Sequence, residues 1–170
     1  MLTIRSAEVP AGSLLSGCVT SGVYADCYVT EVSGSVSHAQ FVEAFYTTTL
    51  FKLERLLLAL MASSPSTDAQ AKELAEGRRA SFAAWSVEAR AHDQLLLSAG
   101  RTRSWLMVVA PAGVDGSGTR LFFGSAVVPR RSSGGGLGPV FGALLGFHKV
   151  YSRALLLSAR MRLSRQGSLR

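Results

Sequence analysis

The spacing of hydrophobic residues changes along the chain. Between residues 37 and 77 apolar residues recur at helical spacing, and from Phe82 to Val128 they recur at roughly every second position. The stretch from Gly138 to Leu163 returns to a helical pattern and is the longest of all. The pattern therefore predicts an α+β fold in which short helices precede a sheet and a long C-terminal helix follows it.

Two capping-box patterns mark the starts of short helices. Ser37 is followed three residues later by Gln40, and Thr67 is followed at the same spacing by Gln70. In such a box the hydroxyl and the glutamine side chain each bond to a free backbone amide. We expect helices after both residues, and a further helix over Leu50–Ala62 between them.

Strand patterns share β-branched and aromatic residues and are separated by short turns. The expected strands are Tyr24–Val32, Phe82–Arg90, Gln94–Ser98, Arg103–Ala110 and Thr119–Val128. The last four follow one another closely, which is typical of an antiparallel meander. Tyr24–Val32 and residues 2–9 are expected to supply the rest of the sheet.

The C-terminal stretch divides into two faces when it is drawn as a helix. At 1.5 Å per residue such a helix would span roughly 39 Å, enough to cross a small domain. Its basic side carries Lys149, Arg153 and Arg160, joined by Gly142 and Gly146. The apolar side, expected to face the sheet, carries Val140, Ala143, Leu144, Phe147, Val150, Tyr151, Ala154, Leu157 and Met161.

Composition indicates a single folded domain. The chain has 170 residues, of which 48% are hydrophobic and 17% are charged, as in proteins with a real core. We assign residues 1–163 to the domain and expect residues 164–170 to form a disordered basic tail. No apolar run approaches the ~20 residues of a membrane span, and the N-terminus lacks a signal-peptide pattern, so we expect a cytoplasmic protein. Cys18 and Cys27 are expected to be unlinked thiols.

Charge is distributed unevenly. The net charge is +7, no acidic residue follows Asp115, and nine basic residues do. This asymmetry fits either a solvated helix face or a surface for an anionic partner. Nucleic acid is not expected as that partner, because no aromatic residues are interleaved with the arginines and no zinc-finger, KH or RRM pattern is present.

The order of elements resembles the helix-grip fold of the START, polyketide-cyclase and pollen-allergen superfamily. Five stretches are also similar to a group of bacterial proteins of unknown function within it. They are EVPAGSLL, YADCYVTEVSG, FKLERLL, WSVEARAHDQLLL and LGPVFGALLGFHKVYSRALL, which together extend over most of the chain. The last stretch carries the closest likeness, with a Gly-rich entry followed by Phe147-His148-Lys149 and a basic, leucine-rich helix.

The resemblance implies a curved antiparallel sheet wrapped around the long helix, with a hydrophobic cavity between them. The cavity would be lined by Phe147, Tyr151, Trp85 and Trp105, with His148 near its mouth. It would bind an apolar or amphipathic small molecule, lipid-like or aromatic, without catalysis. The resemblance brings no shared catalytic residues; no cofactor is expected, and a homodimer is an open alternative.

Two other functions remain open. A cyclase or isomerase would draw its acid–base groups from His148, Tyr151 and Glu88, and Glu88 is expected on one strand face with Ser86 and Arg90. An interaction module would instead bind an anionic partner through the basic helix face. Asp26 and Glu31 fall on opposite strand faces, so they do not make a catalytic carboxylate pair. His38, His92 and His148 lack metal-ligand spacing, so no metal site is expected.

Overall fold

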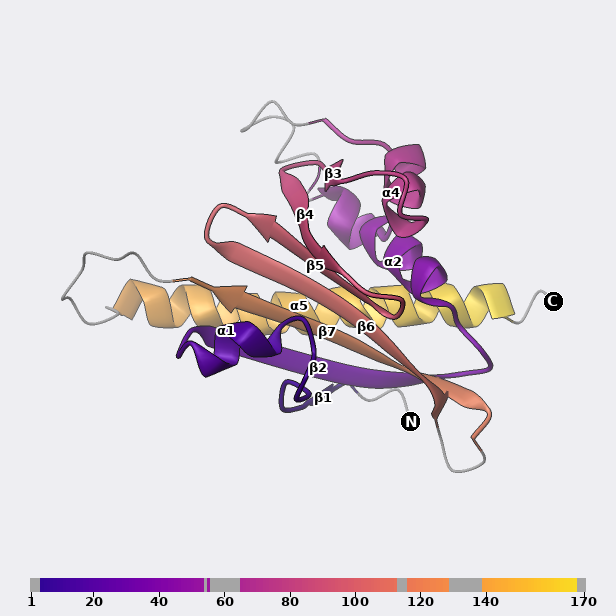
Figure 1. Cartoon of the computed structure of the whole chain (residues 1–170), viewed down its shortest axis with the longest axis horizontal. Coiled ribbons are helices and arrows are strands. Elements are labelled where there is room, and N and C mark those ends of the chain that lie inside the picture. Colours follow the sequence, from indigo (N-terminus) through magenta and orange to yellow (C-terminus); the bar gives the residue numbers. More distant parts are fainter. Residues whose placement is uncertain (1–3, 54, 56–64, 113–115, 129–138, 168–170) are drawn as a thin grey trace.

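The computed structural model describes residues 4–53, 55, 65–112, 116–128 and 139–167, and of residues 112, 139–147 and 167 only the backbone (Figure 1). The strands are β1 (Arg5–Ser6), β2 (Tyr24–Ser33), β3 (Ser81–Phe82), β4 (Trp85–Arg90), β5 (Gln94–Ala99), β6 (Thr102–Ala112) and β7 (Gly118–Val127). The helices are α1 (Ser16–Thr20), α2 (His38–Tyr46), α4 (Asp68–Ala75) and α5 (Pro139–Gly167).

The seven strands form one antiparallel sheet in the order β1-β2-β7-β6-β5-β4-β3. The predicted meander is confirmed, because β3 to β7 are neighbours in chain order. The first long strand, β2, lies beside the last strand of the meander. It pairs with β7 from Tyr24 opposite Val127 to Ser33 opposite Gly118. The α+β class and the C-terminal helix packed on a sheet are therefore as expected.

Both predicted capping boxes are present. Ser37 accepts from the Gln40 amide at the start of α2, and Thr67 accepts from the Gln70 amide at the start of α4. Of the helix expected over Leu50–Ala62, residues 50–53 and 55 are helical and the remainder lies outside the described residues. Cys18 and Cys27 are both free thiols, as predicted.

Each face of the sheet carries its own core. On one face α5 and α2 pack over side chains such as Tyr28, Leu106 and Phe123, with α4 beside α2. On the other face α1 and the segment before it cover Cys27, Trp105 and Phe122. Figure 1 shows the arrangement, with α5 crossing behind the strands and α1 in front of them.

Gly124 allows the second core to close tightly. A Cβ at this position would lie 2.6 Å from Leu15 Cδ2 and 2.9 Å from Trp105 Cε3, well inside normal contact distance. Any side chain would push Leu15 or the indole outward. β7 therefore needs glycine at this position, because Leu15 and Trp105 pack directly against its backbone.

The inward face of α5 is not the one predicted. Val150 and Met161, expected in the core, are 69% and 42% exposed, whereas the buried positions are Ser152, Leu155, Leu156, Ala159 and Leu163. Apolar residues occur on nearly all sides of this helix, so hydrophobicity alone does not fix its orientation.

The structure differs from the sequence analysis at both ends of the chain. Residues 164–167, assigned to a disordered tail, continue α5. The stretch before β2, which carried no clear pattern, contains the short helix α1, whose preceding residue Leu15 is fully buried against the sheet. Its helical form follows from tertiary packing, because five residues are too few for a stable isolated helix.

The orientation of α5 predicts opposite outcomes for two substitutions on it. Leu156→Ala removes a fully buried side chain and should lower the free energy of unfolding by about 2–5 kcal/mol. Val150→Ala removes an exposed one and should change it by less than about 0.5 kcal/mol. Urea titrations of both variants make the comparison, and a larger loss for Val150→Ala would mean that the helix faces the other way.

Candidate functional site

A pocket of about 240 Å³ lies between the sheet and α5. Its apolar walls come from α2 and the helical turn after it, from β4 and β7, and from α5. They are Phe45, Phe51, Trp85, Phe123, Tyr151 and Leu155. The rest of the lining is Ala99 and six polar or charged residues, Thr102, Arg103, Ser104, Ser125, His148 and Ser152. An apolar cavity with a few placed polar groups is the usual form of a small-molecule site.

A hydrogen-bonded cluster joins the sheet to α5 at this pocket. Ser125 Oγ lies 2.7 Å from Asp26 Oδ1 and 2.6 Å from His148 Nε2. An ionised carboxylate only accepts, so Ser125 donates to Asp26 and His148 Nε2–H donates to Ser125. The second carboxylate oxygen lies 3.7 Å from the same Nε2. His148 Nε2 therefore carries a hydrogen, directed toward the sheet.

The strand register places these side chains. Asp26 pairs with Ser125 across β2 and β7, and Ser125 pairs with Ser104 across β7 and β6. Three neighbouring strands thus carry a polar row on the face of the sheet that α5 covers. His148 lies four residues before Ser152 on α5, so both project from one side of the helix above that row. The row is sheltered, since the Asp26 side chain is only 9% exposed.

Tyr46 extends the polar row from α2. Its hydroxyl lies 3.2 Å from Ser104 Oγ, and both groups are buried. On the other side the Tyr28 hydroxyl donates to Asp26 Oδ2 over 3.4 Å. Burial and the nearby Asp26 charge raise the pKa of Tyr28 to about 12, so this phenol stays protonated and keeps donating. The row is thus held by hydrogen bonds at both ends.

The cluster does not have the geometry of a nucleophilic triad. In a triad the imidazole contacts the nucleophile with one nitrogen and the carboxylate with the other. Here Ser125 and Asp26 both approach the same nitrogen of His148, and Ser125 donates directly to the carboxylate. The arrangement fixes the position of polar groups and does not activate Ser125 as a nucleophile.

The structure brings together three of the five predicted site residues. Trp85, His148 and Tyr151 all line the pocket. Trp85 Nε1 is buried and has no hydrogen-bond partner among the described residues. The side chain of Phe147 lies outside the described residues, although its backbone belongs to α5.

Trp105 lies on the opposite face of the sheet and does not belong to the pocket. Its indole packs near Phe122, with ring centroids 6.3 Å apart, and Nε1 donates to Gln94 Oε1 over 2.9 Å. Strand alternation explains the correction, because Ser104, the preceding residue, faces α5. Both faces of β6 are buried, so the sequence pattern did not distinguish them.

The polar residues of the row were missed as a group. The sequence analysis considered Asp26 only as a partner of Glu31 in a carboxylate pair. Glu31 lies on the other face of β2, where its Oε1 is 2.9 Å from Arg120 Nη2. A signal was available in the strand patterns, because Asp26 and Ser125 each interrupt an apolar alternation. Their pairing across β2 and β7 depends on the register, which the sequence did not show.

The acid–base group expected for an enzyme is not assembled. A β-bulge between Val87 and Ala89 breaks the alternation of β4, so Ser86, Glu88 and Arg90 do not share a face. Glu88 Oε2 lies 2.5 Å from Arg103 Nε. Arg90 Nη2 donates to the Leu74 carbonyl over 2.7 Å. Neither Glu88 nor Arg90 lines the pocket beside His148 and Tyr151.

Basic residues on α5 contact the rest of the domain. Arg153 donates to Ser6 Oγ over 3.0 Å and lies over the Tyr28 ring, 5.3 Å from its centroid. Arg162 donates to the Thr47 carbonyl over 3.0 Å. These arginines connect β1 and the end of α2 to the helix through neutral groups, so their charge is not compensated by these contacts.

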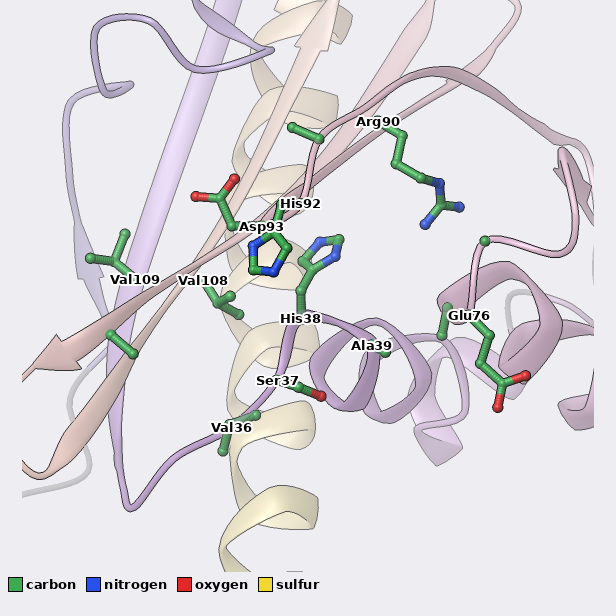
Figure 2. A pocket seen from close by; sticks show the side chains of 14 residues that line it. Val36, Ser37, His38, Ala39, Glu76, Arg90, His92, Asp93, Val108 and Val109 are labelled. Atoms are coloured by element: carbon green, nitrogen blue, oxygen red, sulfur yellow. The ribbon is translucent and has the colours of Figure 1, made fainter.

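The other two histidines belong to a separate open cleft of about 670 Å³ (Figure 2). His38 is only 8% exposed, whereas His92 is exposed in the turn between β4 and β5. Burial lowers the pKa of His38 to about 4, so its imidazole is neutral near pH 7. Within the described part of the chain, no three His, Cys, Asp or Glu side chains are placed to hold a metal ion.

No protein-family model, curated protein or solved structure matches this chain. Among the residues described, no helix is both long enough and apolar enough to cross a bilayer. The geometry of the pocket and of the cleft is therefore the basis for any functional inference.

The polar row predicts a measurable loss when its central hydroxyl is removed. Ser125→Ala leaves the buried Asp26 carboxylate without its shortest hydrogen bond and should destabilise the fold by about 1–3 kcal/mol. Ser158→Ala is the matched control and should change little, because Ser158 donates to the Ala154 carbonyl of its own helix and takes no part in the polar row. Equal effects in chemical denaturation would contradict a structural role for the row.

The buried imidazole of His38 predicts a pH dependence of stability. The folded state keeps His38 neutral down to about pH 4, while the unfolded chain protonates it below about pH 6.5. The unfolded state therefore binds more protons in this window, and stability should fall by up to about 3 kcal/mol as pH drops through it. His38→Gln should reduce the dependence of unfolding free energy on pH between about 4 and 6.5, and His92→Gln should leave it unchanged. The reverse result would show that His38 is not the group responsible.

Proposed function

We propose that the protein binds a small aromatic or short amphipathic molecule in the pocket between the sheet and α5, without converting it. The support is a cavity with aromatic and aliphatic walls and a few polar groups at fixed positions. The polar groups are tied to one another, and Ser125 in particular is already bonded to both Asp26 and His148. This favours binding over catalysis.

The pocket volume narrows the range of ligands. A cavity of ~150 Å³ holds a benzene-sized molecule, and drug-sized ligands occupy ~300 Å³ or more. At about 240 Å³ this pocket suits one ring with a short substituent better than a long acyl chain. Of the lipid-like and aromatic ligands implied by the resemblance, the aromatic class is the one that we propose.

Trp85 provides the observation that carries the proposal. Its Nε1–H is buried beside the pocket without a hydrogen-bond partner among the described residues. A buried donor left unpaired costs about 1–3 kcal/mol, which a ligand oxygen at this position would recover. Tyr151 and Phe123 would contact the ring, and Ser152 and His148 lie where a polar substituent would reach α5.

We also propose that the chain has the helix-grip architecture of the START and polyketide-cyclase superfamily. The element order, the antiparallel sheet and the long helix packed across it support this assignment. So does the position of the pocket between sheet and helix. The resemblance of the C-terminal stretch, in which His148 and Tyr151 lie, agrees with it.

A thermal-shift screen tests the proposed ligand class. Indole, phenol, benzyl alcohol and octanoate are compared, and the ring compounds should raise Tm in a concentration-dependent way, more than octanoate does. Ala99→Trp introduces a large side chain into the pocket lining and should abolish the ligand-dependent increase in Tm. Ala69→Trp, at an exposed position on α4, is the control and should keep it.

The outcomes separate the alternatives. A shift that survives Ala99→Trp would place the ligand elsewhere. No shift with any of the four compounds would contradict binding of this class. The unliganded Tm of each variant shows whether the substitution has damaged the fold, so that a lost gain is not confused with unfolding.

A further inference from the structure

The open cleft beside α2 is formed by three parts of the chain. Its lining comes from residues 36–39 at the start of α2, residues 75–77 at the end of α4, and residues 90–93 between β4 and β5 with 108–110 of β6. Its volume of about 670 Å³ exceeds that of the pocket under α5. Figure 2 shows the side chains of His38, His92 and Asp93 close to the middle of the cleft and Arg90 to one side.

The N-terminus of α2 presents free backbone donors to this cleft. The capping box satisfies the Gln40 and Ser37 amides, and the first intrahelical bond runs from the Phe41 amide to the Ser37 carbonyl. The amides of His38 and Ala39 precede that bond, so the helix gives them no acceptor. Both residues line the cleft, at the end of the helix where the dipole favours negative charge.

His38 adds a buried acceptor beside these donors. Its residue exposure is 8%, and its Nε2 has no hydrogen-bond partner among the described residues. The ring bonds to the Leu106 backbone, and since Nε2 is unpartnered the bond is made by Nδ1–H. Nε2 therefore carries a lone pair and can accept a hydrogen bond from a bound molecule.

Two opposite charges flank His38. Arg90, His92 and Asp93 line the cleft with His38, and within the described part of the chain neither Arg90 nor Asp93 forms an ion pair. Figure 2 shows Arg90 on one side of His38, and His92 and Asp93 on the other. Glu76, the other carboxylate in the cleft, is already paired with Arg78. The cleft thus has a donor side and an acceptor side.

We propose that this cleft binds a small zwitterion of the amino-acid type. The carboxylate of the ligand accepts from the His38 and Ala39 amides and from the Arg90 guanidinium. Its ammonium group donates to His38 Nε2 and to the Asp93 carboxylate. Val36, Val108 and Val109 provide apolar surface for the side chain of the ligand. This site is separate from the pocket under α5, and neither proposal depends on the other.

The proposal distinguishes a zwitterion from molecules that carry only one of its charges. L-Leucine, 3-methylbutylamine and 4-methylpentanoate share an apolar tail and differ in which charged group is present. In an amide NMR titration, L-leucine should shift the His38 and Ala39 signals saturably. The amine and the acid should each bind at least about tenfold more weakly, since each loses one set of charged contacts. Equal binding of either analogue, or no shift with L-leucine, would overturn the proposal.

Substitutions on the two sides of the cleft locate the contacts. Arg90→Gln and Asp93→Asn should each weaken L-leucine binding about tenfold or more. Arg101→Gln is the matched control, because Arg101 also donates to a backbone carbonyl, that of Val128 over 2.7 Å, but lies outside the cleft. His38→Gln, which retains an acceptor, should bind better than His38→Leu. Loss of binding in Arg101→Gln as large as in Arg90→Gln would contradict the site.

Discussion

The packing of α5 against the sheet is the contact on which the rest of the structure depends. Leu155, Leu156, Ala159 and Leu163 bury one side of the helix in the core that also contains Tyr28, Leu106 and Phe123. Without this cover, one whole face of the sheet would be open to water at a cost of roughly 25 cal/mol per Å² of apolar surface. The helix also closes the pocket and brings His148 to the polar row, so stability and the proposed site depend on the same contact.

Polar groups inside this interface have a definite arrangement. Asp26, Ser125 and Ser104 form a row across three strands, and His148 meets it from α5. Buried groups of this kind are tolerated because each finds a partner, and a partly broken row would cost more than an apolar one. Serine side chains are also short. They leave space between the sheet and the helix that larger side chains would fill. We infer that the row both fixes the register of α5 and keeps the pocket open.

Much of the fold could be predicted because its signals are local. The boxes at Ser37 and Thr67 start their helices as expected, and the alternation after Phe82 predicts the meander. What failed depends on three-dimensional packing. The inward face of α5 could not be read from a helix that is apolar on most sides, and Trp105 lies in a strand whose two faces are both buried. Of the predicted site residues, Trp85, His148 and Tyr151 line one pocket, whereas Asp26 and Ser125 were not predicted together because only the register pairs them.

Intermolecular nuclear Overhauser effects between bound indole and the protein would test the proposed ligand pocket most directly. Leu155 and Phe123 lie on opposite walls of the pocket, one on α5 and one on β7, and Met107 lies on the far face of the sheet. A ring held between sheet and helix should give contacts to both Leu155 and Phe123 and none to Met107. Contacts to Met107 instead, or no contact to either wall at a saturating indole concentration, would contradict the proposal.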